Sequence, residues 1–382
     1  MRYPRLLDLE SDLKTRSVFL FGPRQTGKTT FLRERYPDCR WYNLLQGDTF
    51  LRLAQQPGRL RQELGPLDPS DGPVIIDEIQ KLPSLLDDIH DLIESRGFRF
   101  VLTGSSPVKL RRGGTNLLGG RARIRNLFPL VSAEIGDWDP DRAVRYGMLP
   151  SVYLSEDPME ELESYCGVYL QLEVQSEGLV RGVEPFSRFL QSAARCAGEQ
   201  VVYEQVAFKA QVPSRTVREY YQVMIDTLIG VMLEPVRQGF GNRRKPVSHG
   251  KFYFFDVGVV HALAGTRAID EHTTEYGRAF EQLLFTEIRA WLSYTRDKRP
   301  LGFWRTSDGM EVDFVVDDEV AIEVKASQNL HRSDFRGLRA IAEEHSFSRR
   351  ILVCREPVRR IVESVEVIPY REFLSELWNS GL

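Results

Sequence analysis

Long apolar runs and cysteines are both scarce in this sequence. Of its 382 residues 42% are hydrophobic, yet no run approaches the roughly eighteen apolar residues that a membrane-spanning helix needs. The N-terminal stretch MRYPRLLDLESDLKTRS contains no apolar core of a signal peptide. The cysteines are far apart and form no C-x-x-C pair, which argues against a zinc site and a disulfide framework; they are Cys39, Cys166, Cys196 and Cys354. We therefore expect a cytoplasmic protein that has no membrane partner.

Acidic residues are missing from two stretches of the chain, although the formal net charge is −3. Six basic residues lie from Lys109 to Arg125, and five more lie from Arg237 to Lys251. Local patches of this kind indicate contact with nucleic acid better than the total charge does. We therefore expect DNA as a partner.

The segment SVFLFGPRQTGKTTFLRERYP is typical of a strand, a glycine-rich loop and a helix. The apolar run Val18–Phe21 predicts a buried strand, and the next residues fit the pattern G-x-x-x-x-G-K-[ST] of a phosphate-binding loop. In such a loop, backbone N–H groups and the helix N-terminus surround the phosphates. We expect Lys28 to reach the β- and γ-phosphates of ATP and Thr29 to offer its hydroxyl to Mg²⁺. The expected nucleotide-binding residues here are Gly22, Pro23, Arg24, Gln25, Thr26, Gly27, Lys28, Thr29 and Thr30.

A second apolar run ends in two acidic residues. In GPVIIDEIQKLP, the predicted strand Val74–Ile76 is followed directly by Asp77 and Glu78. We expect Asp77 to bind Mg²⁺ through water and Glu78 to polarise the water that attacks ATP. The alternative is an acidic strand end that only caps the next helix, but the phosphate-binding loop upstream favours the catalytic interpretation.

The segment FRFVLTGSS predicts a third strand, Phe98–Leu102, which is followed by Thr103, Ser105 and Ser106. A polar residue at such a strand tip can position the attacking water. Three strands that all end in residues suited to phosphate chemistry indicate a parallel sheet with its ligand at the carboxyl edge.

One bacterial and archaeal family of AAA+-type ATPases resembles this sequence in three segments: GPRQTGKTT, VIIDEIQKLP and LTGSSPVKLRRGGTNLLGGRARIRNLFPL. The resemblance implies that Ser105 or Ser106 is the sensor after the third strand. It also implies that Arg121 is a candidate arginine finger acting across a subunit boundary. Such a finger would require a homo-oligomer, with a hexamer as one candidate. The alternative for Arg121 is a basic loop that docks on DNA or on an acidic surface.

The middle of the chain carries the pattern of a winged helix-turn-helix. A helix over Val202–Ala210, a turn at Gln211–Pro213 and a second helix from Ser214 are predicted, since serine is a favourable N-cap residue. A strand, a basic loop and a second strand complete the order of elements. Apolar residues at helical spacing share one face of the second helix: Val217, Tyr220, Tyr221, Met224 and Leu228. The expected DNA contacts are Arg215 and Arg218 on that helix and Arg243, Arg244 and Lys245 in the wing. The alternative is a helical packing domain with a solvated basic loop.

The C-terminal part has charged residues within predicted strands. A long amphipathic helix, three strands, a helix and a fourth strand resemble the core of PD-(D/E)XK nucleases. This resemblance implies that Glu281, Asp313 and Glu323 hold Mg²⁺ and that Lys325 is the catalytic lysine that orients or deprotonates water. The alternatives are that Glu323 and Lys325 form a structural ion pair, or that the fold grips DNA without cutting it.

These patterns predict an α/β chain with a P-loop parallel-sheet ATPase domain, a winged helix-turn-helix and an α/β restriction-endonuclease-like domain. The predicted limits are 1–136 for the ATPase core, 137–190 for a helical lid or connector, 191–265 for the winged helix and 266–382 for the nuclease-like domain. The expected function is that of an oligomeric, DNA-binding ATPase that moves along DNA or remodels it. Two alternatives stay open: a nucleotide-switched regulator, and a defence-type effector in which ATP licenses a metal-dependent nuclease.

Overall fold

The computed structural model of the protein describes most of the chain. The described residues are 3–56, 58–107, 110, 118–169, 182–236, 247–266 and 269–382. The chain divides into two compact units: one is Met1–Pro129 with Asp226–Ile229, and the other is Leu130–Ile225 with Gly230–Leu382.

Within the described residues, the first unit holds a five-stranded sheet of order β2-β3-β4-β1-β5, in which all neighbours run parallel. Its strands are β1 (Ser17–Phe21), β2 (Trp41–Asn43), β3 (Val74–Asp77), β4 (Phe100–Gly104) and β5 (Ala122–Asn126). All residues of β1, β3 and β4 are buried, as their apolar runs require. Because β1, β3 and β4 run parallel, their carboxyl ends lie at one edge of the sheet, as predicted.

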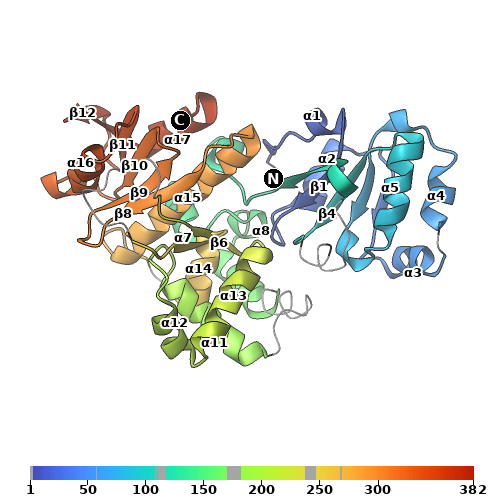
Figure 1. The fold of residues 1–382 in the computed structure, drawn as a ribbon, viewed down its shortest axis with the longest axis horizontal. Helices are drawn as coiled ribbons and strands as arrows, with labels where there is room; N and C mark the ends of the chain where they lie inside the picture. Colours follow the sequence, from blue (N-terminus) through green and yellow to red (C-terminus); the bar gives the residue numbers. More distant parts are fainter. Residues whose placement is uncertain are drawn as a thin grey trace. The chain divides into compact units, whose positions relative to one another are not determined.

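Helices accompany this sheet. They are α1 (Glu10–Leu13), α2 (Lys28–Arg35), α3 (Gly47–Gln55), α4 (Arg59–Leu64) and α5 (Leu85–Arg96). Helix α5 packs through Leu86, Ile89 and Leu92 into one core with Phe19 and Leu102 of the sheet, and Figure 1 shows α5 to one side of this sheet.

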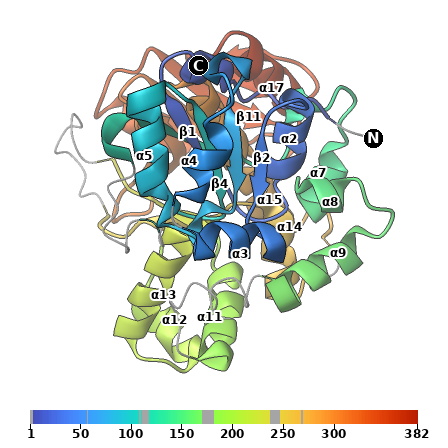
Figure 2. The same ribbon diagram turned by 90° about the vertical axis from the view of Figure 1, so that its right-hand side faces the viewer.

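The second unit begins with helices. They are α7 (Pro140–Tyr146), α8 (Pro150–Tyr153), α9 (Pro158–Ser164), α11 (Val183–Arg195), α12 (Tyr203–Ala210) and α13 (Ser214–Asp226). Figures 1 and 2 both show α11, α12 and α13 grouped together. The antiparallel strands β6 (Gly230–Leu233) and β7 (Lys251–Phe254) follow. The ring of Tyr221 on α13 lies 4.9 Å from those of Phe189 on α11 and Phe252 on β7.

The predicted order of helix, turn, helix and hairpin is thus observed, with two qualifications. Leu228 was expected on the second helix, but α13 ends at Asp226 and the backbone of Leu228 has a positive φ of 63°. The wing residues Arg243, Arg244 and Lys245 lie outside the described residues.

Within the described residues, the C-terminal part holds a six-stranded mixed sheet of order β12-β13-β11-β10-β9-β8. Its strands are β8 (Leu301–Arg305), β9 (Glu311–Val316), β10 (Val320–Val324), β11 (Arg349–Cys354), β12 (Arg360–Val362) and β13 (Val365–Pro369). Strands β8, β9 and β10 are antiparallel neighbours, whereas β10, β11 and β13 run parallel. The remaining helices are α14 (Val257–Ala264), α15 (Thr274–Thr295), α16 (Arg336–Ala342) and α17 (Tyr370–Asn379).

The predicted helix, three strands, helix and strand correspond to α15, β8–β10, α16 and β11, while β12, β13 and α17 were not predicted. In the part of the chain that the structure describes, every helix is too short or too polar to cross a membrane.

Candidate active site

The phosphate-binding loop connects β1 to α2 and depends on two glycines. A Cβ atom on Gly22 would lie 2.5 Å from the carbonyl oxygen of Leu127, so no larger residue fits there. Gly27 precedes α2 with a positive φ of 88°, which glycine adopts without strain. The buried Thr26 hydroxyl donates to the Pro23 carbonyl (2.9 Å) and closes the loop. The loop thus has the tight turn and close backbone approach that phosphate binding requires.

Lys28, at the first position of α2, is 7% exposed and donates from Nζ to the carbonyl oxygens of Gly22 (2.7 Å) and Pro23 (3.0 Å). The loop carbonyls therefore hold the ammonium group within the loop that would surround a phosphate. Of the other predicted loop residues, Thr30 is exposed, whereas Arg24 and Gln25 are half-buried.

The tips of β3 and β4 meet at Asp77. Its carboxylate accepts hydrogen bonds from the hydroxyls of Thr29 (3.1 Å) and Thr103, and Asp77 is 2% exposed. The two groups predicted to share a Mg²⁺ ion are therefore neighbours, and hydroxyl and carboxylate oxygens are ligands that Mg²⁺ accepts. The Thr103 hydroxyl at the tip of β4 contacts both Asp77 and the backbone N–H of Glu78, and its place directly after the apolar run was the signal for it. Ser105 and Ser106 are both buried.

Glu78 follows Asp77 with a left-handed backbone, φ 64° and ψ 46°. Such a conformation costs a residue other than glycine on the order of 1–3 kcal/mol. Its N–H donates to the Thr103 hydroxyl (3.1 Å), and its carboxylate accepts from the Gln80 side-chain amide (2.5 Å). Gln80 is 7% exposed, and its own oxygen Oε1 has no hydrogen-bond partner. The sequence did not indicate this role of Gln80.

Arg5 is a second residue that the sequence did not single out. Its guanidinium group donates to the carbonyl oxygens of Thr26 (2.7 Å), Phe128 (2.5 Å) and Pro129 (3.1 Å). It thereby joins the phosphate-binding loop to the segment that follows β5.

The candidate finger Arg121 and its neighbours on β5 pair within the first unit. Arg121 pairs with Glu94 of α5. Arg123 and Arg125 both pair with the fully buried Asp12, at 2.5 Å and 2.7 Å. These arginines of the basic stretch therefore hold the fold together, and their charge is partly neutralised within it.

The helix α13 presents the predicted DNA contacts. The Arg215 side chain is 91% exposed and pairs with Glu219 at 3.2 Å, one turn later. Arg218 is also exposed, and its guanidinium carbon lies 4.7 Å from the ring centroid of Tyr203 on α12. The opposite face of α13, with Val217, is buried.

The carboxylates predicted to hold the nuclease metal lie around two lysines. Lys251 Nζ is 2.6 Å from Glu311, 3.1 Å from Glu281 and 3.7 Å from Asp313. Lys325 Nζ lies 2.5 Å from Glu323 Oε1, while Glu323 Oε2 is buried without a hydrogen-bond partner. The predicted pair of Glu323 and Lys325 is observed, whereas Lys251 was counted only as part of a basic stretch.

Burial and like charges shift the pKa values in this cluster. Burial, then the charge of Glu281, raises the pKa of Asp313 to about 6. Burial and the charge of Asp313 raise the pKa of Glu323 well above its usual range. Burial alone would lower the pKa of Lys251, but Glu281 and the neighbouring acidic groups raise it well above the usual value. The ammonium group is therefore charged at neutral pH. In the described part of the chain, no group of three or more His, Cys, Asp or Glu side chains is arranged to hold a metal ion, so the nuclease metal stays a prediction.

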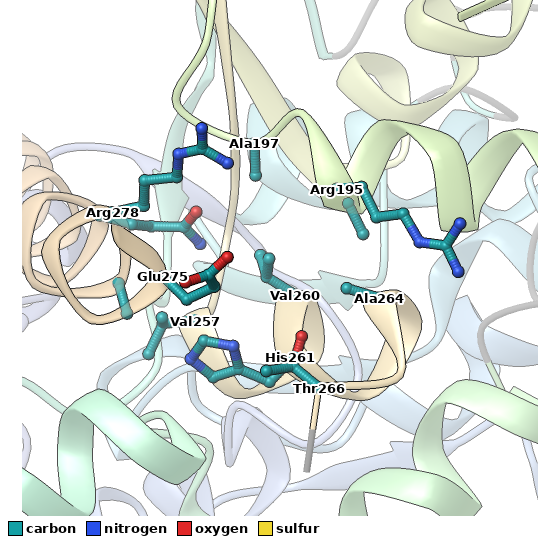
Figure 3. Close-up of a pocket in the computed structure, with 12 residues that line it drawn as sticks. Arg195, Ala197, Val257, Val260, His261, Ala264, Thr266, Glu275 and Arg278 are labelled. Atoms are coloured by element: carbon teal, nitrogen blue, oxygen red, sulfur yellow. The ribbon is translucent and has the colours of Figure 1, made fainter. Parts of the chain in front are cut away.

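A cavity of about 280 Å³ lies between α11, α14 and α15 and contains none of the predicted site residues. Figure 3 shows Val260 and His261 of α14 near Glu275 and Arg278 of α15. His261 contacts the Val144 carbonyl (3.1 Å), and burial lowers its pKa to about 4, so it is neutral at neutral pH. Arg278 pairs with Glu199. We assign no chemistry to this cavity.

Three family models match successive parts of the chain. Residues 14–136 match an AAA domain, residues 138–270 match a domain of unknown function, DUF8612, and residues 276–373 match a domain of unknown function, DUF4143. The first match supports an AAA+ P-loop ATPase in the N-terminal part of the chain.

Two curated relatives are uncharacterized proteins of Mycobacterium bovis and Mycobacterium tuberculosis. Each is 26% identical over 313 residues, which cover 78% of this chain and 67% of the relative. These relatives extend the likeness beyond the AAA domain but name no activity.

Two solved structures give weak likenesses. A STAND ATPase with a tetratricopeptide repeat sensor from Pyrococcus horikoshii is 14% identical with a TM-score of 0.23, covering 76% of this chain and 48% of its own. The ORC1 protein of Aeropyrum pernix in complex with DNA is 15% identical with a TM-score of 0.23, covering 66% of this chain and 87% of its own. This chain spans about half of the STAND protein, and both TM-scores are too low to support a conclusion.

Proposed function

We propose that this chain is an oligomeric, DNA-binding ATP hydrolase that uses ATP to move along DNA or remodel it. The observation that carries the hydrolase is the convergence of Thr29, Asp77 and Glu78 at one sheet edge, beside a phosphate-binding loop. The AAA domain match over residues 14–136 supports the same assignment.

Each residue of this site has a distinct part in hydrolysis. The loop N–H groups and Lys28 bind the phosphates of ATP, and Lys28 exchanges its contacts to the loop carbonyls for phosphate oxygens. Thr29 and Asp77 would hold Mg²⁺, which supplies positive charge to the transferring phosphoryl group. Glu78 accepts a proton from the attacking water, and Thr103 fixes the backbone of Glu78.

The DNA-binding part of the proposal rests on the middle and C-terminal elements. Helices α12 and α13 and the β6-β7 hairpin occur in the order of a winged helix. The exposed Arg215 and Arg218 on α13 are suited to contact phosphates. The order of α15, β8–β11 and α16 supports a nuclease-like fold that contacts DNA.

A nucleotide-switched regulator is the second candidate, and the contact between Gln80 and Glu78 favours it. The hydrogen bond from the buried Gln80 amide (2.5 Å) restricts the rotation of the Glu78 carboxylate. A catalytic carboxylate restricted in this way suits a protein that hydrolyses ATP slowly and acts while ATP is bound.

The two candidates differ in their response to DNA. The experiment is to measure ATP hydrolysis by the full chain without DNA and with double-stranded, single-stranded and branched DNA. Hydrolysis that DNA accelerates supports the motor, whereas slow hydrolysis that ignores DNA supports the regulator. A chain that neither binds nor hydrolyses ATP contradicts both.

A further inference from the structure

The ammonium group of Lys251 lies where the sequence predicts a metal ion. Lys251 comes from β7 and is 2% exposed, Glu281 comes from α15, and Glu311 and Asp313 come from β9. Three elements that are distant in sequence thus converge on one buried cation. The Tyr253 hydroxyl on the same hairpin donates to Glu281, which ties the hairpin to α15 a second time.

The contacts of this cation have the geometry of an ammonium group and not of a metal ion. The nitrogen lies 2.6 Å from Glu311 and 3.1 Å from Glu281, which are ordinary hydrogen-bond distances. Mg²⁺ holds its oxygen ligands at about 2.0–2.1 Å. A lysine offers three N–H donors, and three carboxylates lie around it. A divalent ion would need the same space, so these residues do not fit a metal ion while Lys251 is in place.

We propose that Lys251 replaces the metal ion of the nuclease-like carboxylate pattern, so that this site binds no divalent cation and the C-terminal domain does not cleave DNA. The ammonium group forms ion pairs with Glu281, Glu311 and Asp313 and thereby connects the β6-β7 hairpin to α15 and to the C-terminal sheet. The proposal does not depend on the ATP site. With Lys251 in place these three carboxylates are not arranged to hold a metal ion. The proposal implies a latent site, because removal of the lysine would free their hard oxygens, which suit Mg²⁺ or Mn²⁺.

Arg305 is a second cation that contacts this cluster, but it lies at the edge of the cluster. Arg305 reaches Glu311 through that residue's other oxygen, at 2.9 Å, and its side chain is 35% exposed. Its loss would leave Lys251 and the space around it unchanged. Arg305→Ala is therefore a matched control that removes one positive charge from the same cluster.

The test measures Mn²⁺ binding to the full chain by titration calorimetry without nucleotide. All variants carry Asp77→Asn, which removes the proposed metal ligand of the ATP site. We expect no bound Mn²⁺ in this parent or with Arg305→Ala. We expect Lys251→Ala to gain one bound Mn²⁺ per chain, and Asp313→Asn added to it to abolish that binding.

The parent alone can overturn the proposal. Mn²⁺ binding that is present with Lys251 intact and lost on Asp313→Asn would show a working metal site, as would Mn²⁺-dependent DNA cleavage that Asp313→Asn abolishes. A folded Lys251→Ala chain that binds no Mn²⁺ would refute the latent site. If that variant does not fold by circular dichroism, Lys251→Met, which keeps the apolar stem, takes its place, and the parent titration decides the central claim in every case.

Discussion

At the scale of single residues, substitutions of Glu78 and Lys28 should separate ATP hydrolysis from ATP binding. Glu78→Gln keeps the size of the side chain but removes the group that accepts the proton from water. We expect ATP binding to persist and hydrolysis to fall by ~10²-fold or more. Binding is measured with a fluorescent ATP analogue and hydrolysis by phosphate release.

Lys28→Ala is the companion variant, and it should abolish ATP binding itself, because it removes the charge that meets the β- and γ-phosphates. Hydrolysis by Glu78→Gln at the parent rate would show that another residue polarises the water, and Thr103 at the neighbouring strand tip would then be examined first.

Local sequence was sufficient to propose the phosphate-binding loop, because such a loop is formed by consecutive residues, and the structure places its Thr29 beside Asp77. The contacts of Arg5 and Lys251 could not be predicted in the same way. Arg5 meets Phe128 across 123 positions of the chain, and Lys251 meets Glu281 across 30 positions. A long-range partner is set by how the strands assemble, which a motif does not contain.

A buried carboxylate joins three elements of the second unit. Glu287 on α15 accepts hydrogen bonds from the backbone N–H of Ser132 (2.6 Å), from the Ser132 hydroxyl (3.0 Å) and from the indole of Trp378 on α17 (2.7 Å). Burial raises its pKa to about 7 although these hydrogen bonds lower it. From about pH 4.5 to pH 7 the folded chain therefore keeps a proton that the unfolded chain has lost, so this group's contribution to stability falls as pH rises through that window.

Glu287→Gln should remove this pH dependence. We expect the parent's free energy of unfolding, relative to the variant's, to fall by on the order of 3 kcal/mol between pH 4.5 and pH 7.5. Urea unfolding at both pH values measures it. The control is Trp378→Phe, which loses one hydrogen bond but keeps the titrating carboxyl group, so its pH dependence should remain. An unchanged dependence in Glu287→Gln would assign the titration to another group.

The helix α13 carries the prediction about DNA. Arg215→Glu with Arg218→Glu should weaken duplex binding for all sequences, because phosphate contacts carry no sequence information. Each lost contact should reduce the slope of log K against log salt by about 0.9. Fluorescence anisotropy over a salt series measures the slope, and Arg371→Glu, on the exposed surface of α17, is the control. An unchanged slope would show that the DNA contact lies on a surface other than α13.

Elements with a clear apolar pattern could be predicted, and those without one could not. The helix α13 follows from apolar residues at helical spacing, whereas strands such as β1 and β3 follow from short continuous apolar runs. The apolar spacing predicted that the second helix extends to Leu228, but α13 ends at Asp226 and the backbone of Leu228 has a positive φ. The strand β12 has only three residues and is largely exposed, so its segment lacks the apolar pattern that reveals a buried strand.

The candidate arginine finger Arg121 is a prediction about the assembled molecule, because such a finger would complete a site in a neighbouring subunit. We expect Arg121→Ala to lower ATP hydrolysis on the order of 10³-fold. A mixture of Arg121→Ala and Glu78→Gln chains should regain part of the activity, since some interfaces then join an intact Arg121 to an intact Glu78. Phosphate release from mixed and separate chains measures this.

Glu94→Ala is the control for the candidate finger, because it removes the ion-pair partner of Arg121 on α5 and keeps the guanidinium group itself. If Arg121 only stabilises the fold through that pair, both alanine variants should lose the same stability and the mixture should regain nothing.

The guanidinium group of Arg5 connects two segments of the first unit through three backbone carbonyls. It grips Thr26 in the phosphate-binding loop and Phe128 and Pro129 where the first compact unit ends. One side chain near the start of the chain therefore fixes the spacing between the phosphate-binding loop and the end of the segment after β5. A loop that changed shape around a nucleotide would have to break these hydrogen bonds or carry residues 128–129 with it.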